Sequence, residues 1–167
     1  MDLFEKCYEY TAAKEAIASG YYPYFIPLSE NEGTEAEFQG QRLIMCGSNN
    51  YLGLTTHPSV RQAAIDAVHR FGTSCTGSRF LNGTLELHEQ LEHELAAWVG
   101  KPAALVFSTG MQVNLGVISA LVGKGDVVIL DKDDHASIVD GACLSRGERL
   151  RFHHQDMESL EAVLARI

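Results

Sequence analysis

The 167-residue sequence has no long hydrophobic run and carries little positive charge. No apolar stretch approaches the ~18–20 residues that a membrane-spanning helix needs, so only a peripheral association with a membrane stays open. Thirteen lysines and arginines stand against 22 aspartates and glutamates, which gives a net charge of −9. Because a general nucleic-acid binder needs a basic face, this composition argues against nucleic acid as a partner. Any anion site must therefore be local.

Cysteine is also sparse, and its spacing carries no motif. The four cysteines are widely separated and form no C-x-x-C pair: Cys7, Cys46, Cys75 and Cys143. The N-terminus has no secretory signal pattern, so the sequence predicts reduced thiols in a cytoplasmic protein. The hydrophobic content of 46% and charged content of 21% are typical of a folded globular chain and not of a disordered one.

Three common ligand motifs are missing. Lys124 follows Gly123, but these residues end a predicted helix instead of starting one, so they do not form a nucleotide-binding P-loop. The glycine-containing loop at 72–83 lacks the G-x-G-x-x-G spacing of dinucleotide-binding folds. His88 and His93 are five positions apart, about 140° round an α-helix, so they cannot share a zinc ion as i, i+4 histidines do. We expect no metal site.

The second half of the sequence alternates apolar strand patterns with helical ones. Strands are predicted at 103–107, 127–130 and, more weakly, 150–153, and helices at 110–122, 136–144 and 157–167, the last capped by Asp156. This alternation predicts an α/β fold whose parallel strands are covered by helices on both faces. Three parallel strands leave an uncovered edge, so we expect the chain to be the N-terminal part of a longer protein.

The first half has a different pattern. We expect a helix over 2–19 ended by Gly20, an extended aromatic segment at 21–27, a β-hairpin of residues 34–38 and 42–46, a helix over about 58–71, and a further helix to about Val99 that is capped by Thr84. These patterns divide the chain into an N-terminal arm over 1–55 and the first part of a larger domain over 56–167.

Residues 107–116, FSTGMQVNLG, contain the first candidate site. Ser108, Thr109 and Gly110 form a tight turn between a predicted strand and a predicted helix. The first N–H groups of a helix lack partners and the helix dipole is positive there, so such a turn attracts anions. Taken alone, an ordinary turn with hydroxyl caps explains the pattern better than a phosphate site does. Residues 131–135 form the second candidate, because they also follow a predicted parallel strand.

Four segments in this order give a much more specific signal: SNNYLGL at 48–54, GTSCTGSRFLNGT at 72–84, FSTGMQVNLG at 107–116 and DKDDHASIVDG at 131–141. Together they resemble the α-oxoamine synthases, which are fold-type I enzymes dependent on pyridoxal 5'-phosphate (PLP). The resemblance begins at about Tyr22 and corresponds to the N-terminal two fifths of the family's usual length. It implies the aspartate aminotransferase-like large domain and a homodimer with its active sites at the interface. These enzymes condense an amino acid with an acyl-CoA and release CO2.

The resemblance also implies roles for individual residues around the cofactor. Gly110 and Met111 would give backbone N–H groups to the PLP phosphate, with Ser108 and Thr109 beside it. His135 would lie flat on the pyridine ring and act as a catalytic residue by fixing the ring plane. Without the resemblance, His135 would more simply be a helix N-terminal residue bonded to the backbone.

Three further residues are implied to contact the substrates. Asn49 matches the family position that points an amide toward the amino-acid substrate. Ser78 matches a position that lines the pocket for the substrate side chain, where a small hydroxyl leaves room for more than glycine. Arg79 would position the acyl-CoA or bridge the dimer, and a buried structural ion pair explains it equally well. His88 is interpreted as structural.

Within the family, YYPYFIPL, GSNNYLGL and TGSRFLNGT look most like the bacterial serine palmitoyltransferase branch. This predicts L-serine and palmitoyl-CoA as substrates, in the first step of sphingolipid synthesis. The alternatives are an 8-amino-7-oxononanoate synthase or a 2-amino-3-ketobutyrate CoA ligase and, in another class, a non-catalytic homologue or truncated partner subunit. The family's Schiff-base lysine is expected beyond Ile167, and the lysines present lie in other contexts: Lys6, Lys14, Lys101, Lys124 and Lys132. The chain alone is therefore predicted to be inactive, and because its predicted sheet is incomplete it is also predicted to fold poorly.

Overall fold

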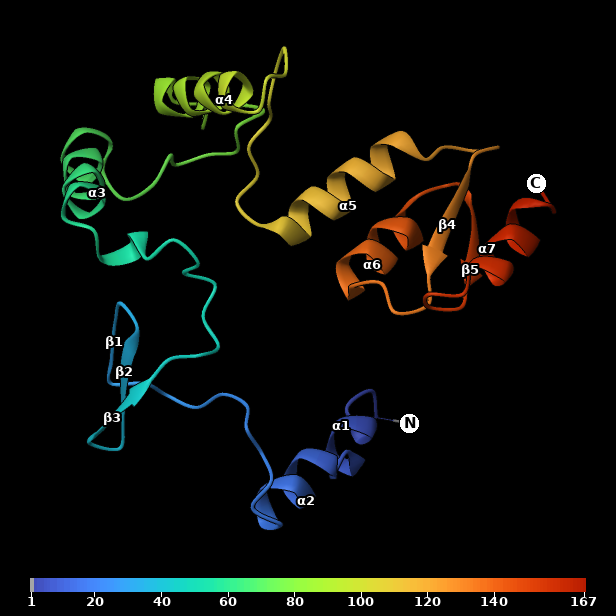
Figure 1. The fold of residues 1–167 in the computed structure, drawn as a ribbon, viewed down its shortest axis with the longest axis horizontal. Coiled ribbons are helices and arrows are strands. Elements are labelled where there is room, and N and C mark those ends of the chain that lie inside the picture. The colour runs from blue at the N-terminus through green and yellow to red at the C-terminus, as the bar shows by residue number, and fades with distance from the viewer. Residues whose placement is uncertain (1) are drawn as a thin grey trace. The chain divides into compact units, whose positions relative to one another are not determined.

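The computed structural model describes residues 2–167, which form two compact units (Figure 1). The first unit ends at Cys75 and the second begins at Thr76. This division lies later than the predicted end of the arm at residue 55, and the predicted domain boundary stays a prediction. No helix among residues 2–167 has both the length and the hydropathy to cross a bilayer.

The first unit begins with two short helices, α1 (Glu5–Glu9) and α2 (Ala12–Ala18), where one continuous helix was predicted. Tyr10 interrupts them with an extended backbone, at φ −74° and ψ 99°. Neither helix buries a residue, and short helices without tertiary packing are only marginally stable in water. The predicted end at Gly20 is confirmed: its φ is +75°, and the N–H groups of Gly20 and Tyr21 donate to the carbonyls of Ile17 and Ala16.

A three-stranded antiparallel sheet follows, in the order β1 (Glu30–Glu32), β2 (Glu35–Phe38) and β3 (Gln41–Ile44). The hairpin of β2 and β3 was predicted, and Gln39 and Gly40 both take positive φ in its two-residue turn. Strand β1 was not predicted, because an acidic Glu-Asn-Glu run has little intrinsic strand preference. The unit continues through η1 (Leu54–Thr56) to α3 (Pro58–Phe71), which has the predicted bounds and begins with proline at its first position.

In the second unit, α4 (Glu86–Trp98) begins later than predicted, and Thr84 is not its N-cap. Leu85 occupies that position, and its N–H donates to Nδ1 of His88 at 3.0 Å. The hydroxyl of Thr84 instead donates to the carbonyl of Arg79 at 2.7 Å. The predicted cap was wrong because the Thr84 hydroxyl bonds a carbonyl of the preceding loop and accepts from no N–H group at the start of α4.

The rest of this unit alternates helices and strands: α5 (Gly110–Leu121), β4 (Val127–Asp131), α6 (Ala136–Leu144), β5 (Glu148–Phe152) and α7 (Met157–Leu164). Strands β4 and β5 pair in parallel, with Asp131 opposite Phe152. Helices α5 and α6 pack side by side, and α7 contacts β5 (Figure 1). The buried side chains here include Leu130 on β4, Ala142 on α6 and Val163 on α7. The Asp156 cap of α7 is confirmed, because its carboxylate accepts from the N–H of Ser159 at 2.8 Å.

The predicted strand at 103–107 is not observed, so the parallel sheet has two strands in the described chain and not three. A strand requires a partner for its backbone groups, and no described strand lies beside this segment. Side chains take that place at Val106: its N–H donates to Oε1 of Glu92 at 2.8 Å, and its carbonyl accepts from Nη1 of Arg79 at 3.3 Å.

Candidate functional site

The N-terminus of α5 is an open group of backbone donors. Thr109 caps the helix: its hydroxyl accepts from the N–H of Gln112 at 3.2 Å and its carbonyl from the N–H of Val113 at 3.1 Å. In the part of the chain that the structure describes, the N–H groups of Gly110 and Met111 donate to no acceptor. A Cβ placed on Gly110 would meet no atom of another part of the described chain within 4 Å, so the surface beside this residue is open. Charge and shape both suit an anion.

His135 lies at the N-terminus of α6 and uses one ring nitrogen there. Its Nδ1 accepts from the N–H of Ser137 at 3.2 Å and lies 2.7 Å from the hydroxyl oxygen of the same residue. The backbone-bonded helix cap that the residues alone favoured is thus present. It leaves the role of the ring faces open, because the bonds involve only the ring edge and the residue is exposed.

One side-chain hydrogen bond joins the two candidate segments. The amide Nδ2 of Asn114 on α5 donates to Oγ of Ser137 on α6 at 2.9 Å. The helices approach closely here because residue 141 is glycine: a Cβ on Gly141 would lie 2.6 Å from the carbonyl oxygen of Asn114. Sequence reasoning identified the α5 N-terminus and His135 but missed Asn114 and Ser137. Their only signal was their position, four residues after Gly110 and two after His135.

The turn between β4 and α6 is fixed by carboxylates. Asp131 accepts from the N–H of Asp133 at 2.8 Å, and its two oxygens lie 3.0 and 3.1 Å from Nδ1 of His154. The Asp133 N–H, followed by the His154 side chain, lowers the pKa of Asp131. Asp134 accepts from the N–H of Asp131 at 3.0 Å. These bonds hold the backbone that leads into His135.

Arg79 lies against α4 in an ion pair. Its guanidinium contacts both carboxylate oxygens of Glu92, at 2.5 and 3.1 Å. The hydrogen bond from Arg79, and next the one from the Val106 N–H, lowers the pKa of Glu92 from 4.5 to about 2. The structural ion pair considered from the sequence is therefore present, and a role of Arg79 toward acyl-CoA or a second subunit stays a prediction.

The neighbouring Ser78 belongs to a tight turn. Its carbonyl accepts from the backbone N–H groups of Leu81, Asn82 and Gly83, at 3.1, 3.2 and 2.8 Å. Ser78 itself is exposed. The turn leaves no room for a side chain at Gly83, where an added Cβ would overlap the Gly77 carbonyl. A role of Ser78 in the substrate pocket stays a prediction.

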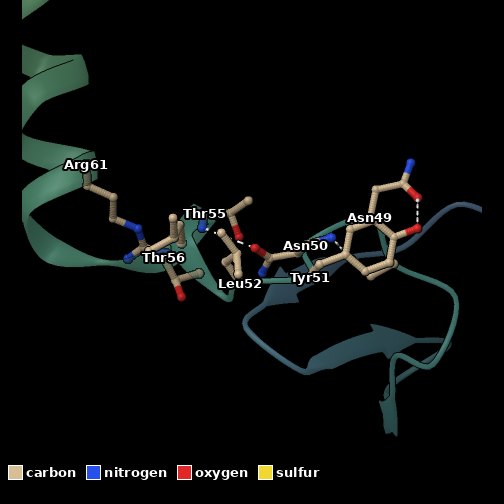
Figure 2. A pocket seen from close by; sticks show the side chains of 9 residues that line it. Asn49, Asn50, Tyr51, Leu52, Thr55, Thr56 and Arg61 are labelled. Atoms are coloured by element: carbon tan, nitrogen blue, oxygen red, sulfur yellow. Dashed lines mark hydrogen bonds between the residues drawn. The ribbon is translucent and has the colours of Figure 1, made fainter. Parts of the chain in front are cut away.

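Asn49 lies in the first unit, on the wall of an open pocket of about 650 Å³ (Figure 2). The pocket is lined by residues 48–52, 54–56 and Arg61. Asn49 accepts through Oδ1 from the Tyr51 hydroxyl at 3.5 Å, while Asn50 accepts from the N–H of Thr55 at 3.3 Å. Asn50 therefore holds the loop, and the predicted substrate contact of Asn49 stays a prediction.

Comparison with known proteins gives a consistent result. The family model described as aminotransferase class I and II matches residues 42–167. A serine palmitoyltransferase from Sphingobacterium spiritivorum is 47% identical over 99% of this chain and 41% of its own length. An 8-amino-7-oxononanoate synthase from Geobacter sulfurreducens is 47% identical over 87% of this chain and 37% of its own.

Solved structures agree with these relatives. Sphingomonas wittichii serine palmitoyltransferase superposes with a TM-score of 0.92 at 44% identity, covering 100% of this chain and 43% of that one. A serine palmitoyltransferase variant from S. paucimobilis, solved with a bound PLP–myriocin aldimine, gives 0.91 at 40% identity, covering 100% and 44%. The chain thus spans about two fifths of the length of these proteins and shares their fold-type I architecture. It belongs to the aminotransferase class I and II family.

Proposed function

We propose that the protein is a PLP-dependent acyltransferase that condenses L-serine with a long-chain acyl-CoA and releases CO2. The observation that carries this proposal is the N-terminus of α5, in a chain whose relatives include serine palmitoyltransferases: two of its N–H groups have no partner among residues 2–167, and the surface beside Gly110 is open. The full activity belongs to the full-length protein, because we expect the lysine that fold-type I enzymes use to lie outside these residues.

The residues of α5 fit the phosphate of PLP. The N–H groups of Gly110 and Met111 would hold the phosphate oxygens, and the positive end of the helix dipole would balance their charge. Thr109 keeps this terminus in shape through its bond to Gln112, and the hydroxyl of Ser108 adjoins it in sequence. Glycine at 110 matters because a side chain would occupy the space that the phosphate needs.

His135 would supply the flat surface on which the pyridine ring lies. When bound, PLP supplies an electron sink for the bond broken at the amino acid's Cα. The protein must then keep that bond aligned, and a stacked imidazole fixed at its Nδ1 edge restrains the ring plane. Asn49 and Ser78 would bind the amino acid, and Arg79, through its Glu92 pair, would shape the loop beside the acyl-CoA. We further propose a homodimer.

The second candidate is synthesis of 8-amino-7-oxononanoate, which the Geobacter sulfurreducens relative of equal identity favours. It differs in the substrates and not in the residues that hold PLP. An enzyme of this kind would use L-alanine and a shorter acyl donor in place of L-serine and palmitoyl-CoA.

The test is an assay of the full-length protein with L-serine, L-alanine and glycine, each combined with palmitoyl-CoA, pimeloyl-CoA and acetyl-CoA. Free CoA thiol and CO2 are both measured. We expect turnover with L-serine and palmitoyl-CoA. Turnover with L-alanine and pimeloyl-CoA alone would favour the second candidate. No turnover with any pair, together with no visible absorbance from a PLP–lysine adduct, would favour a non-catalytic homologue.

A further inference from the structure

Three side chains form a continuous hydrogen-bonded chain across helices α5 and α6. Asn114 Nδ2 lies 2.9 Å from Ser137 Oγ, and Ser137 Oγ lies 2.7 Å from His135 Nδ1. The middle member is buried, with 3% of the Ser137 surface exposed. The buried Ser137 hydroxyl has few alternative arrangements, because it depends on Asn114 and His135 for its partners.

Two donors set the direction of the protons along this chain. The backbone N–H of Ser137 can only donate, and it points at Nδ1 of His135 at 3.2 Å, while the Ser137 hydroxyl makes the shorter contact with Nδ1 at 2.7 Å. Both donors favour a lone pair on Nδ1, which puts the ring proton of the neutral imidazole on Nε2, and we expect the shorter hydroxyl bond to contribute more than the backbone bond. The Asn114 amide donates into the Ser137 oxygen, so the hydroxyl proton of Ser137 is directed to Nδ1.

Helix α5 carries both Asn114 and the proposed phosphate site. Asn114 lies one turn after Gly110, at the helix end where the phosphate is proposed to bind. Gly141 allows the backbone of α6 to approach the Asn114 carbonyl, and α5 and α6 lie side by side in Figure 1. The position of the α5 N-terminus and the orientation of the His135 ring are thus coupled through Asn114 and Ser137.

We propose that Asn114 and Ser137 are positioning residues that hold His135 in its Nε2–H tautomer and fix its ring relative to the N-terminus of α5. The purpose of this arrangement rests on the proposed function, in which His135 stacks on PLP. Two acceptor bonds at one nitrogen prevent the ring from rotating about its Cβ–Cγ bond. The tautomer itself is a property of the protein without cofactor.

The test uses the full-length protein labelled with ¹⁵N-histidine, with and without PLP. Long-range ¹H–¹⁵N spectra separate the two neutral tautomers, and His135→Gln identifies the signal of this residue. We expect wild-type protein to show the Nε2–H form alone. Ser137→Ala removes the hydroxyl donor and Asn114→Asp gives that hydroxyl a competing acceptor, so both variants are expected to show mixed tautomers. Ser137→Thr keeps a hydroxyl and is expected to restore the single form.

Ser119→Ala is the matched control, because Ser119 lies on α5 and donates to the carbonyl of Leu115 in its own helix. It should leave the His135 signal unchanged. A wild-type Nδ1–H form, or an unchanged tautomer in Ser137→Ala, would overturn the inference even if PLP binds. The expected tautomers in a full-length protein that binds no PLP would support the arrangement and overturn the proposed function alone.

Discussion

The guanidinium of Arg79 and the carboxylate of Glu92 meet at two points, with Nη1 2.5 Å from Oε1 and Nη2 3.1 Å from Oε2. Both side chains also bond Val106, in the segment that leads into α5. Glu92 accepts from the Val106 N–H, and Arg79 donates to the Val106 carbonyl. They connect the loop before α4, the helix α4 itself and this segment. The pair therefore anchors the chain that precedes the proposed phosphate site.

Replacing Glu92 with glutamine tests the Arg79–Glu92 pair through the pH dependence of the protein's stability. The pKa of Glu92 in the folded protein is about 2, below its ordinary 4.5. Its carboxylate therefore contributes stability that is complete above about pH 4.5 and is lost as the pH falls toward 2. We expect Glu92→Gln to lower the urea midpoint of the full-length protein at pH 7. As the pH is lowered from 7 toward 2, we expect the urea midpoint of the variant to fall less than that of the wild type. Glu89→Gln, an exposed change on the same helix, is the control. Parallel acid profiles in wild type and Glu92→Gln would refute the assignment.

The contribution of Asp131, at the end of β4, to the stability of the protein should depend on pH with the same sign as that of Glu92. The Asp133 N–H, followed by His154, lowers its pKa from the ordinary 3.8, so its stabilising contribution is lost as the pH falls below that range. We expect Asp131→Ala to destabilise the full-length protein more than Asp131→Asn, because asparagine keeps an acceptor for the Asp133 N–H. Thermal unfolding at pH 7 measures both variants. Equal losses would show that the backbone bond is unimportant.

Helices with a local signal at their first residue were predicted to begin at the right place. Helix α3 begins at Pro58, and α7 begins after Asp156, whose carboxylate caps it. The errors arose where distant residues decide the structure. Residues 103–107 have a strand-like composition, but a strand needs a neighbour, and no local pattern reveals whether one is present. Thr84 has the chemistry of a cap and donates to the Arg79 carbonyl instead, because the loop folds back on itself.

The candidate site shows the same contrast between residues with a local sequence signal and residues whose contacts depend on tertiary packing. Gly110 and His135 could be identified from short motifs, because each owes its position to a helix terminus. Asn114 and Ser137 are 23 residues apart and meet only because α5 and α6 pack closely at Gly141. A helix–helix contact of this kind depends on tertiary packing, which sequence periodicity does not specify.

Two glycine substitutions should separate packing from ligand binding. Gly141→Ala places a Cβ 2.6 Å from the carbonyl oxygen of Asn114, and such overpacking costs about 1–3 kcal/mol. Gly110→Ala meets no protein atom within 4 Å, so we expect little change in stability but at least a roughly tenfold weaker affinity for PLP, since a bond to a charged group contributes about 1.5–3 kcal/mol. Urea unfolding and PLP titration of the full-length variants measure these effects. Unchanged PLP affinity in Gly110→Ala would contradict the proposed phosphate site.

The isolated 167-residue chain is expected to unfold without a sharp cooperative transition. The buried hydrophobic residues among those described are mostly small: Ala36, Ala96, Leu130, Ala142 and Val163. Large side chains remain in contact with water, including Phe25, Trp98 and Phe80, which are 93%, 83% and 94% exposed. Each large apolar side chain that is fully buried contributes about 1.5–3 kcal/mol, so this chain forgoes much of the stabilisation that a folded domain of its length has.

Calorimetry of the isolated chain and of the full-length protein, at several concentrations, measures this difference. We expect a broad transition and strong binding of a hydrophobic dye for the isolated chain, and a sharp transition for the full-length protein. Self-association that buries the exposed aromatic residues would appear as a transition temperature that rises with concentration. A sharp transition of the isolated chain, independent of concentration and with equal calorimetric and van't Hoff enthalpies, would show that its small core suffices.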